Sequence, residues 1–222
     1  MQRTEAEEHL RVIRSLMEKA TIYRAVSAPT ALLGGGLSVL VGVLLAGPFR
    51  ETAEHPMWFF GPWLAVLAFT AAANAYFIRR DAVRRGDPFV SPGMKMALRA
   101  LAPAYLVAAF FTGLAMIGTM GSMHGRSYFA LPVAWCLAYG LGLLAMAHFA
   151  PRSLVWLGWG FLFAGLAAGT VLFFYFGAIL PEGVTPTQVL NATMALTFGG
   201  LHLVYAACAW PRAERAEQGV HA

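Results

Sequence analysis

Six stretches of about 20 or more residues with almost no charged side chains constrain the fold of this chain more than any other feature. An α-helix rises about 1.5 Å per residue, so about 20 apolar residues cross the roughly 30 Å hydrocarbon core of a bilayer. Only 12% of the 222 residues are charged, whereas soluble proteins contain about a quarter. The sequence therefore predicts an all-α polytopic membrane protein, a compact bundle of six transmembrane helices at Ala28 to Gly47, Met57 to Ile78, Ala97 to Met120, Tyr128 to Phe149, Leu154 to Leu180 and Gln188 to Trp210.

Proline and capping residues mark where these helices begin. Pro29 cannot donate a backbone hydrogen bond and forces a kink or a new start, which Ser27 is placed to cap. Ser91-Pro92 and Thr185-Pro186 give the third and sixth spans the same start signal, and Gly86-Asp87-Pro88 ends the second. Short connections predict that successive spans pack as antiparallel neighbours. The chain thus divides into residues 1–27, a membrane domain of residues 28–210 and a tail of residues 211–222.

Residues 1–27 are expected to form an amphipathic helix on the cytoplasmic side. At 100° per residue, one arc collects its apolar residues, including Leu10, Ile13, Leu16 and Met17, and most charged residues fall on the other side. The segment holds five basic and four acidic residues, whereas helices that lie on membranes are usually rich in Lys and Arg. The balance favours docking on a protein partner or on a second copy, although the apolar face also suits a lipid surface.

The distribution of basic residues predicts the orientation. One side of the membrane carries 14 Lys and Arg residues and 8 acidic residues, and the other carries only Arg50 and Arg126 with 3 acidic residues. Basic loops remain in the cytoplasm, so both termini are predicted to be cytoplasmic. The excess of positive charge is therefore topological, and it does not indicate nucleic-acid binding.

Small residues at every fourth position predict where helices approach closely. In lipid, helices associate by close packing, and small side chains allow backbones to meet. The first span has Gly34, Ser38, Gly42 and Ala46 at this spacing, and the fifth has Gly165 and Gly169.

Polar side chains inside the spans are the candidate functional residues, because polar groups are costly in a membrane. The spans contain no Asp, Glu, Lys or Arg at mid-depth, which argues against a proton-coupled carrier built on intramembrane carboxylates. Asn74, His148 and His202, together with Tyr76 and Tyr205, are placed to line a cavity open to the cytoplasm. The alternative is that Asn74 and His202 each make a single interhelical hydrogen bond, while His148 lies at the membrane interface.

Catalytic and cofactor signatures are missing from the sequence. His202 lies about 12 Å and His148 about 2 Å from the cytoplasmic ends of their spans, so the two are poorly placed to bind one haem. There is no HExxH, GxSxG or GxxxxGK motif, and the Cys and His residues lack the spacing of metal ligands. No enzyme activity, cofactor or metal is predicted.

Two segments carry a resemblance to a known group of proteins. At "LMEKATIYRAVSAPTALLGGG" (16–36) and "HFAPRSLVWLGWGFLFAG" (148–165) the chain resembles uncharacterised families of bacterial multi-pass inner-membrane proteins. The resemblance implies the inner (cytoplasmic) membrane of a bacterium, and it implies no activity.

Three functional hypotheses follow. The leading one is a non-enzymatic inner-membrane protein that acts by docking its cytoplasmic helix on a partner or a second copy. The second is a transporter or channel for an apolar or neutral solute, with its cavity near Asn74 and His202. The third is a membrane cytochrome or enzyme, and a Soret absorption band would be the sign of the cytochrome version.

Overall fold

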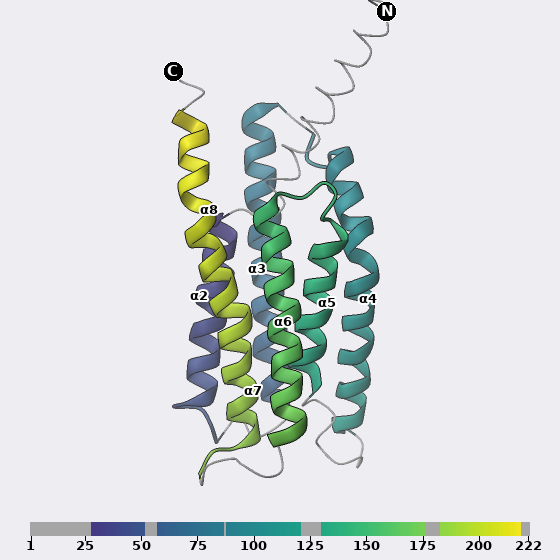
Figure 1. The fold of residues 1–222 in the computed structure, drawn as a ribbon, viewed down its shortest axis with the longest axis vertical. Coiled ribbons are helices and arrows are strands. Elements are labelled where there is room, and N and C mark those ends of the chain that lie inside the picture. Colours follow the sequence, from purple (N-terminus) through teal and green to yellow (C-terminus); the bar gives the residue numbers. More distant parts are fainter. Residues whose placement is uncertain (1–27, 52–56, 87, 121–129, 176–182, 219–222) are drawn as a thin grey trace, which may run out of the picture.

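The structure, a computed structural model, describes residues 28–51, 57–86, 88–120, 130–175 and 183–218, so the predicted amphipathic helix lies outside the described residues. The described segments are helical and contain no strand (Figure 1). Five helical segments are long and apolar enough to cross a membrane, and a sixth is apolar but shorter. The elements are α2 (Ala28–Ala46), α3 (Met57–Arg85), α4 (Pro92–Met120), α5 (Leu131–Ala145), α6 (Arg152–Tyr175), α7 (Pro186–Met194), the π-helix η3 (Ala195–Gly200) and α8 (Leu201–Gln218).

The shorter apolar helix is α5. It has 15 residues and rises about 22 Å, whereas a helix was predicted from Tyr128 to Phe149. The backbone leaves the helix after Ala145 and continues in tight turns, in which the amide of Ala147 donates to the carbonyl of Leu144 over 2.9 Å. A proline disfavours helix at the residue before it, and Pro151 imposes that restriction here. The turns therefore bring the chain to the start of α6.

The predicted start and stop signals act as expected in the described residues. The hydroxyl of Ser91 accepts a hydrogen bond from the amide of Met94, three residues into α4. Thr185 caps α7 in a full capping box: its hydroxyl oxygen accepts from the Gln188 amide, and its own amide donates to the side-chain oxygen of Gln188. Gly86 follows the end of α3 with φ of +72°, a conformation that favours glycine. These predictions from the sequence are confirmed.

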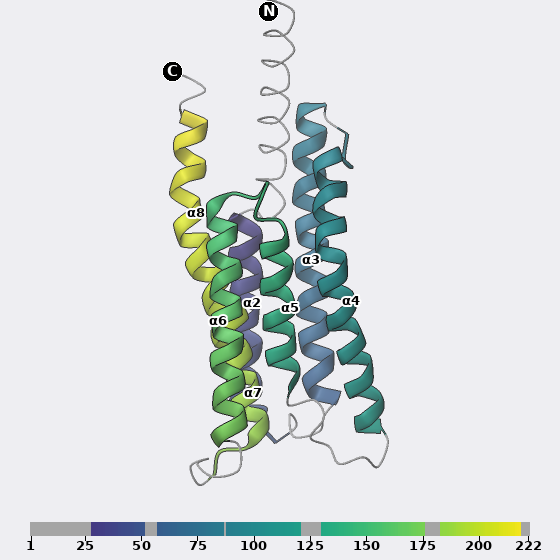
Figure 2. The same ribbon diagram turned by 45° about the vertical axis from the view of Figure 1, so that its right-hand side comes forward.

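The helices run side by side with alternating direction (Figures 1 and 2). The last rod, formed by α7, η3 and α8, lies against α2, so the first and last described helices are neighbours. The helix α2 also contacts α3, α5 lies between α4 and α6, and α6 reaches α8. The helices α3 and α4 make almost no close backbone contact, although a short loop joins them. This pair of successive spans lies side by side and antiparallel, as predicted, but it meets through side chains rather than through close backbone approach (Figure 2).

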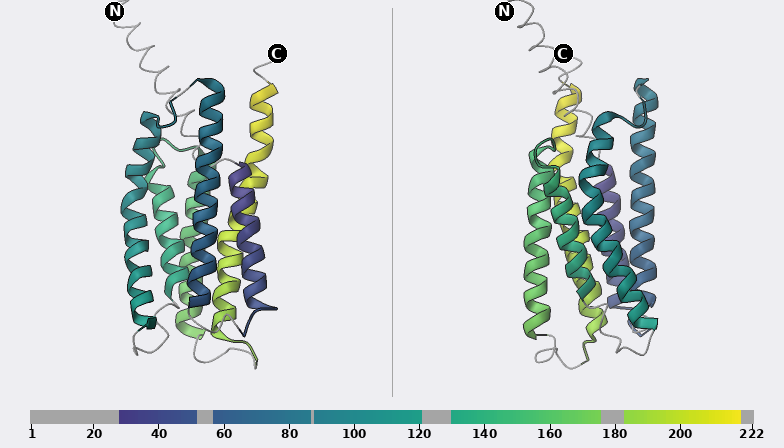
Figure 3. Two further views of the ribbon diagram at one scale, coloured as in Figure 1. Left: turned by 180° about the vertical axis from the view of Figure 1, so that it is seen from behind. Right: turned by 90° about the vertical axis from the view of Figure 1, so that its right-hand side faces the viewer.

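Two apolar clusters fill the bundle. One lies between α2, α5, α6 and α8 around Phe161, Leu154 and Leu143, which are all completely or almost completely buried. The other lies around Phe59, Phe60 and Trp63 of α3, which pack with residues of α4, α5 and α7. These three large rings hold α3 against α4, α5 and α7 through side chains, whereas α2 and α3 approach each other closely at Gly34. The helix α3 stands at the edge of the bundle (Figure 3).

Candidate functional site

A histidine and a tyrosine, both half-buried, form a hydrogen-bonded pair between two of the described helices. His202 of α8 lies with its Nε2 atom 3.0 Å from the hydroxyl of Tyr139 on α5. Its Nδ1 atom lies 2.7 Å from the carbonyl oxygen of Phe198, one turn earlier. A carbonyl oxygen only accepts, so Nδ1 carries the proton and Nε2 of the neutral ring accepts from the Tyr139 hydroxyl. Both ring nitrogens are thus engaged within the chain.

Aromatic rings surround this pair. The ring of Phe161 on α6 lies edge-on to Tyr139, with centroids 4.7 Å apart, and its centroid is 5.3 Å from that of His202. Phe198 contacts Tyr139, Phe161 and His202 with its own ring. Three helices therefore meet at one cluster, which we call the His202 cluster: Tyr139, Phe161, Phe198 and His202. A hydrogen bond among such apolar neighbours holds the helices in one register.

The other residues predicted to line a cavity lie in different surroundings. Tyr205 is buried in the same apolar core as Phe161. His148 is exposed in the turns after α5, and Tyr76 is 63% exposed on α3, where its ring meets that of Phe77.

Asn74 is half-buried on α3, at a distance from the His202 cluster in the helix arrangement. The helices α3 and α8 make almost no close backbone contact with each other, and α2 contacts both. The side of α2 that meets α3 carries Gly34, which faces the side chain of Thr70. A single cavity lined by both Asn74 and His202 therefore stays a prediction. Asn74 is on α3, which contacts α2, whereas His202 is on α8 and contacts α5 and α6.

A second polar link joins helices that are distant in sequence. The indole N–H of Trp63 on α3 donates to the side-chain oxygen of Asn191 on α7 over 2.8 Å, and Asn191 is completely buried. The amide nitrogen of Asn191 has no hydrogen-bond partner within the part of the chain that the structure describes. The depth of Asn191 in its span was the available signal, but the sequence does not show that a tryptophan is its partner.

The π-helix η3 precedes His202 directly and was not predicted. It ends in Gly199 and Gly200, and the hydroxyl of Thr197 donates back to the carbonyl of Thr193 over 2.7 Å. A Thr side chain that bonds the carbonyl four residues earlier often bends its helix. Glycine also allows the backbone to depart from regular α-helical geometry more easily than other residues do. Single π-turns inside helices often occur at functional sites. In this chain the π-turn places Gly199 against α2 and His202 against α5.

Glycines bring the backbones of α2 and the last rod into contact. A Cβ atom added at Gly42 would lie 2.5 Å from the Cβ of Ala195 and 2.9 Å from the carbonyl oxygen of Asn191. Ser38 is buried on the same helix, and the carbonyl of Ala46 accepts from the side chain of Gln188 over 2.8 Å. The residues of the first small-residue stripe thus face two partners, α3 at Gly34 and the last rod further along.

Glycines of α6 face α5 in a similar way. A Cβ added at Gly165 would lie 3.0 Å from the Cβ of Cys136, and one at Gly169 would lie 3.2 Å from Val133. Both Cys136, which is buried, and Cys208, which is exposed, are free thiols. Among the described residues no three His, Cys, Asp or Glu side chains come together as metal ligands would.

Comparisons with known proteins give this chain no relative. No protein-family model, no curated protein and no solved structure matches it. What the fold establishes is the class: an all-helical chain with several apolar helices, compatible with a multi-pass membrane protein.

Proposed function

We propose that this protein is a non-enzymatic protein of the bacterial inner membrane, with six spans and both termini in the cytoplasm, that acts by docking its N-terminal amphipathic helix on a partner protein or on a second copy. Five of these spans are the long apolar helices, and the remaining one is α5. The 15 helical residues of α5 are continued by the turns up to Ala150. The asymmetry of Lys and Arg between the two sides supports the orientation.

The observation that carries the proposal is the anchorage of α2. Residues 1–27, the proposed docking helix, precede α2 directly in the sequence. Among the five long apolar helices α2 is the most buried, with 39% of the residues in its most apolar stretch buried. Contacts at Gly34, Gly35 and Gly42 fix α2 to α3 on one side and to the last rod on the other. A segment attached to α2 is therefore tied to the whole bundle, and a force or a binding event at residues 1–27 acts on the centre of the fold.

The His202 cluster supports the non-enzymatic part of the proposal. Both ring nitrogens of His202 are engaged by Tyr139 and by the carbonyl of Phe198, and aromatic rings fill the surroundings. A general base needs a nitrogen that reaches a substrate. In this arrangement the pair is a structural link between α5 and α8.

The test is the stability of the complex that the full-length protein forms in mild detergent. Leu16→Glu combined with Met17→Glu places two carboxylates on the apolar face of the helix, and we expect the partner or the second copy to be lost from the complex in native mass spectrometry. Ser15→Glu adds one carboxylate on the polar face and is expected to leave the complex intact. An unchanged complex in the double variant would refute the proposal.

A further inference from the structure

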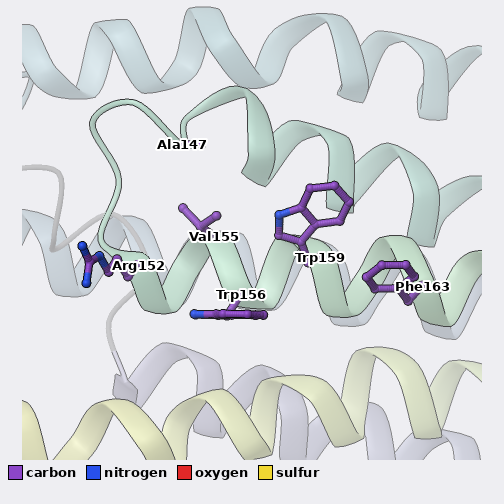
Figure 4. A pocket seen from close by; sticks show the side chains of 6 residues that line it. All are labelled: Ala147, Arg152, Val155, Trp156, Trp159 and Phe163. Atoms are coloured by element: carbon purple, nitrogen blue, oxygen red, sulfur yellow. The ribbon is translucent and has the colours of Figure 1, made fainter.

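A groove on the outer surface of α6 is suited to a ligand that the proposed function does not include. It has a volume of about 640 Å³ and lies where α6 begins, beside the turns that follow α5. Figure 4 shows the guanidinium of Arg152 at one end and the rings of Trp156, Trp159 and Phe163 following along the helix. Val155 and Ala147 complete the lining. One cation therefore stands at the end of an otherwise apolar groove.

The spacing along α6 places the lining residues on one face. Arg152, Val155, Trp156, Trp159 and Phe163 occupy positions i, i+3, i+4, i+7 and i+11 of the helix. Side chains at this spacing form a continuous stripe. From Arg152 to Phe163 the stripe rises about 16 Å, which is about half of the roughly 30 Å hydrocarbon core. The groove thus spans the depth of one leaflet.

We propose that this groove binds one anionic phospholipid of the cytoplasmic leaflet, with the lipid phosphate at Arg152 and an acyl chain along the three aromatic rings. An arginine guanidinium presents several N–H donors in a planar fork that matches two phosphate oxygens. Its long side chain is exposed at the end of the helix, where lipid headgroups lie in the orientation proposed above. The charge at the groove end therefore selects an anion.

The aromatic residues match the rest of such a lipid. Trp156 lies about 6 Å below Arg152 along the helix, at the depth where headgroups give way to hydrocarbon and where tryptophan is enriched in membrane proteins. Its side chain is 74% exposed, so it is free to contact a lipid. Trp159 and Phe163 stack with ring centroids 5.6 Å apart and an angle of 25° between their planes. This stack forms a flat apolar wall for an extended chain.

The chain itself provides a matched control for the cation. Arg99 on α4 is also exposed, and α4 and α6 begin at the same end of the bundle (Figure 1). The residues that follow Arg99 at i+3, i+4 and i+7 are Ala102, Pro103 and Leu106, so no aromatic side chain lies below it at interfacial depth. An effect confined to Arg152 therefore reports the groove, and an equal effect at Arg99 reports general attraction between basic residues and anionic lipid.

The experiment is a titration of the full-length protein, purified in mild detergent, with phosphatidylglycerol or with phosphatidylcholine of the same acyl chains, followed by native mass spectrometry. We expect one phosphatidylglycerol to bind more tightly than phosphatidylcholine. Arg152→Gln should weaken phosphatidylglycerol binding about fivefold, as expected for the loss of one basic residue at an anionic surface, and Arg152→Lys should retain most of the affinity. Trp156→Leu combined with Trp159→Leu should weaken binding of both lipids.

Three results would overturn the lipid site: equal affinity for the two lipids, no change in Arg152→Gln, or the same loss in Arg99→Gln. The site relies on the membrane orientation proposed above but not on the N-terminal helix. The lipid titration measures binding at α6 and does not depend on the complex with a partner. The variant at Leu16 and Met17 tests that complex and does not change α6. Failure of one proposal is therefore visible separately from failure of the other.

Discussion

Two helices of equal hydropathy are buried to very different extents in this molecule. The most apolar 18-residue stretches of α2 and α4 have the same mean hydropathy of 1.9. In α2, 39% of that stretch is buried, whereas in α4 only 6% is. The buried residues of α2 include Gly34, Gly35, Ser38 and Gly42, which meet the neighbouring helices closely. The exposed residues of α4 are mostly large: Leu98, Tyr105, Leu106, Val107, Phe110, Phe111, Leu114 and Ile117.

This comparison separates two properties that are often treated as one. Hydropathy determines which segments enter a membrane, because both helices satisfy the same requirement for apolar surface. Packing within the membrane depends on close approach, since lipid tails solvate large apolar side chains as well as protein does. The close contacts of α2 are therefore built from small residues, whereas the large apolar side chains of α4 face outward.

A large effect is predicted at the contact between η3 and α2. Gly199→Ala would place a Cβ atom 2.6 Å from the side chain of Val39 and 3.1 Å from its backbone nitrogen, so the two helices must move apart. Overpacking of this kind typically destabilises by about 1–3 kcal/mol. The free energy of unfolding, measured by titration of detergent micelles with SDS, should fall by that amount.

The control for this substitution is the next residue. A Cβ atom at Gly200 would meet nothing within 4 Å, so Gly200→Ala should leave the free energy of unfolding unchanged or raise it by up to about 1 kcal/mol, since alanine favours helix. Gly35 and Gly36 of α2 form a second such pair, because Gly35 faces the backbone of Gly199 and Leu203 whereas Gly36 faces open space. Equal effects within either pair would show that the contact does not hold the bundle together.

A smaller effect is predicted at the polar link between α3 and α7. Trp63→Phe and Asn191→Ala each remove one partner of the hydrogen bond between α3 and α7. In a double-mutant cycle of unfolding free energies, the coupling should be about 0.6 kcal/mol and at most about 1.7, the range of hydrogen bonds within membrane proteins. A coupling of zero would mean that the large rings of α3, rather than this bond, attach it to the bundle.

The sequence was a good guide to where the helices lie and a weaker guide to how they meet. Long apolar runs and the caps at Ser91 and Thr185 predicted helices and their starts because these signals act within a few residues. The shortening of α5 and the π-turn of η3 were missed, because Gly and Pro are frequent in transmembrane helices and do not by themselves show where a helix ends or changes its turn. His202 was selected from the sequence, but its partner Tyr139 lies 63 residues away and no local pattern connects them.

The smallest effect is predicted on the outer face of α4. Leu106 is 70% exposed, and in the unfolded state of a membrane protein its helix remains surrounded by lipid. Leu106→Ala removes the same lipid contacts from both states, so the free energy of unfolding should change by less than about 0.5 kcal/mol. Leu143→Ala on α5 makes the same chemical change at a side chain that is 1% exposed, and it should destabilise by about 2–5 kcal/mol because it leaves a cavity. The same SDS titration measures both variants. A large loss at Leu106 would mean that α4 is covered by protein rather than lipid, and the low burial of this helix would then mark an interface with another chain.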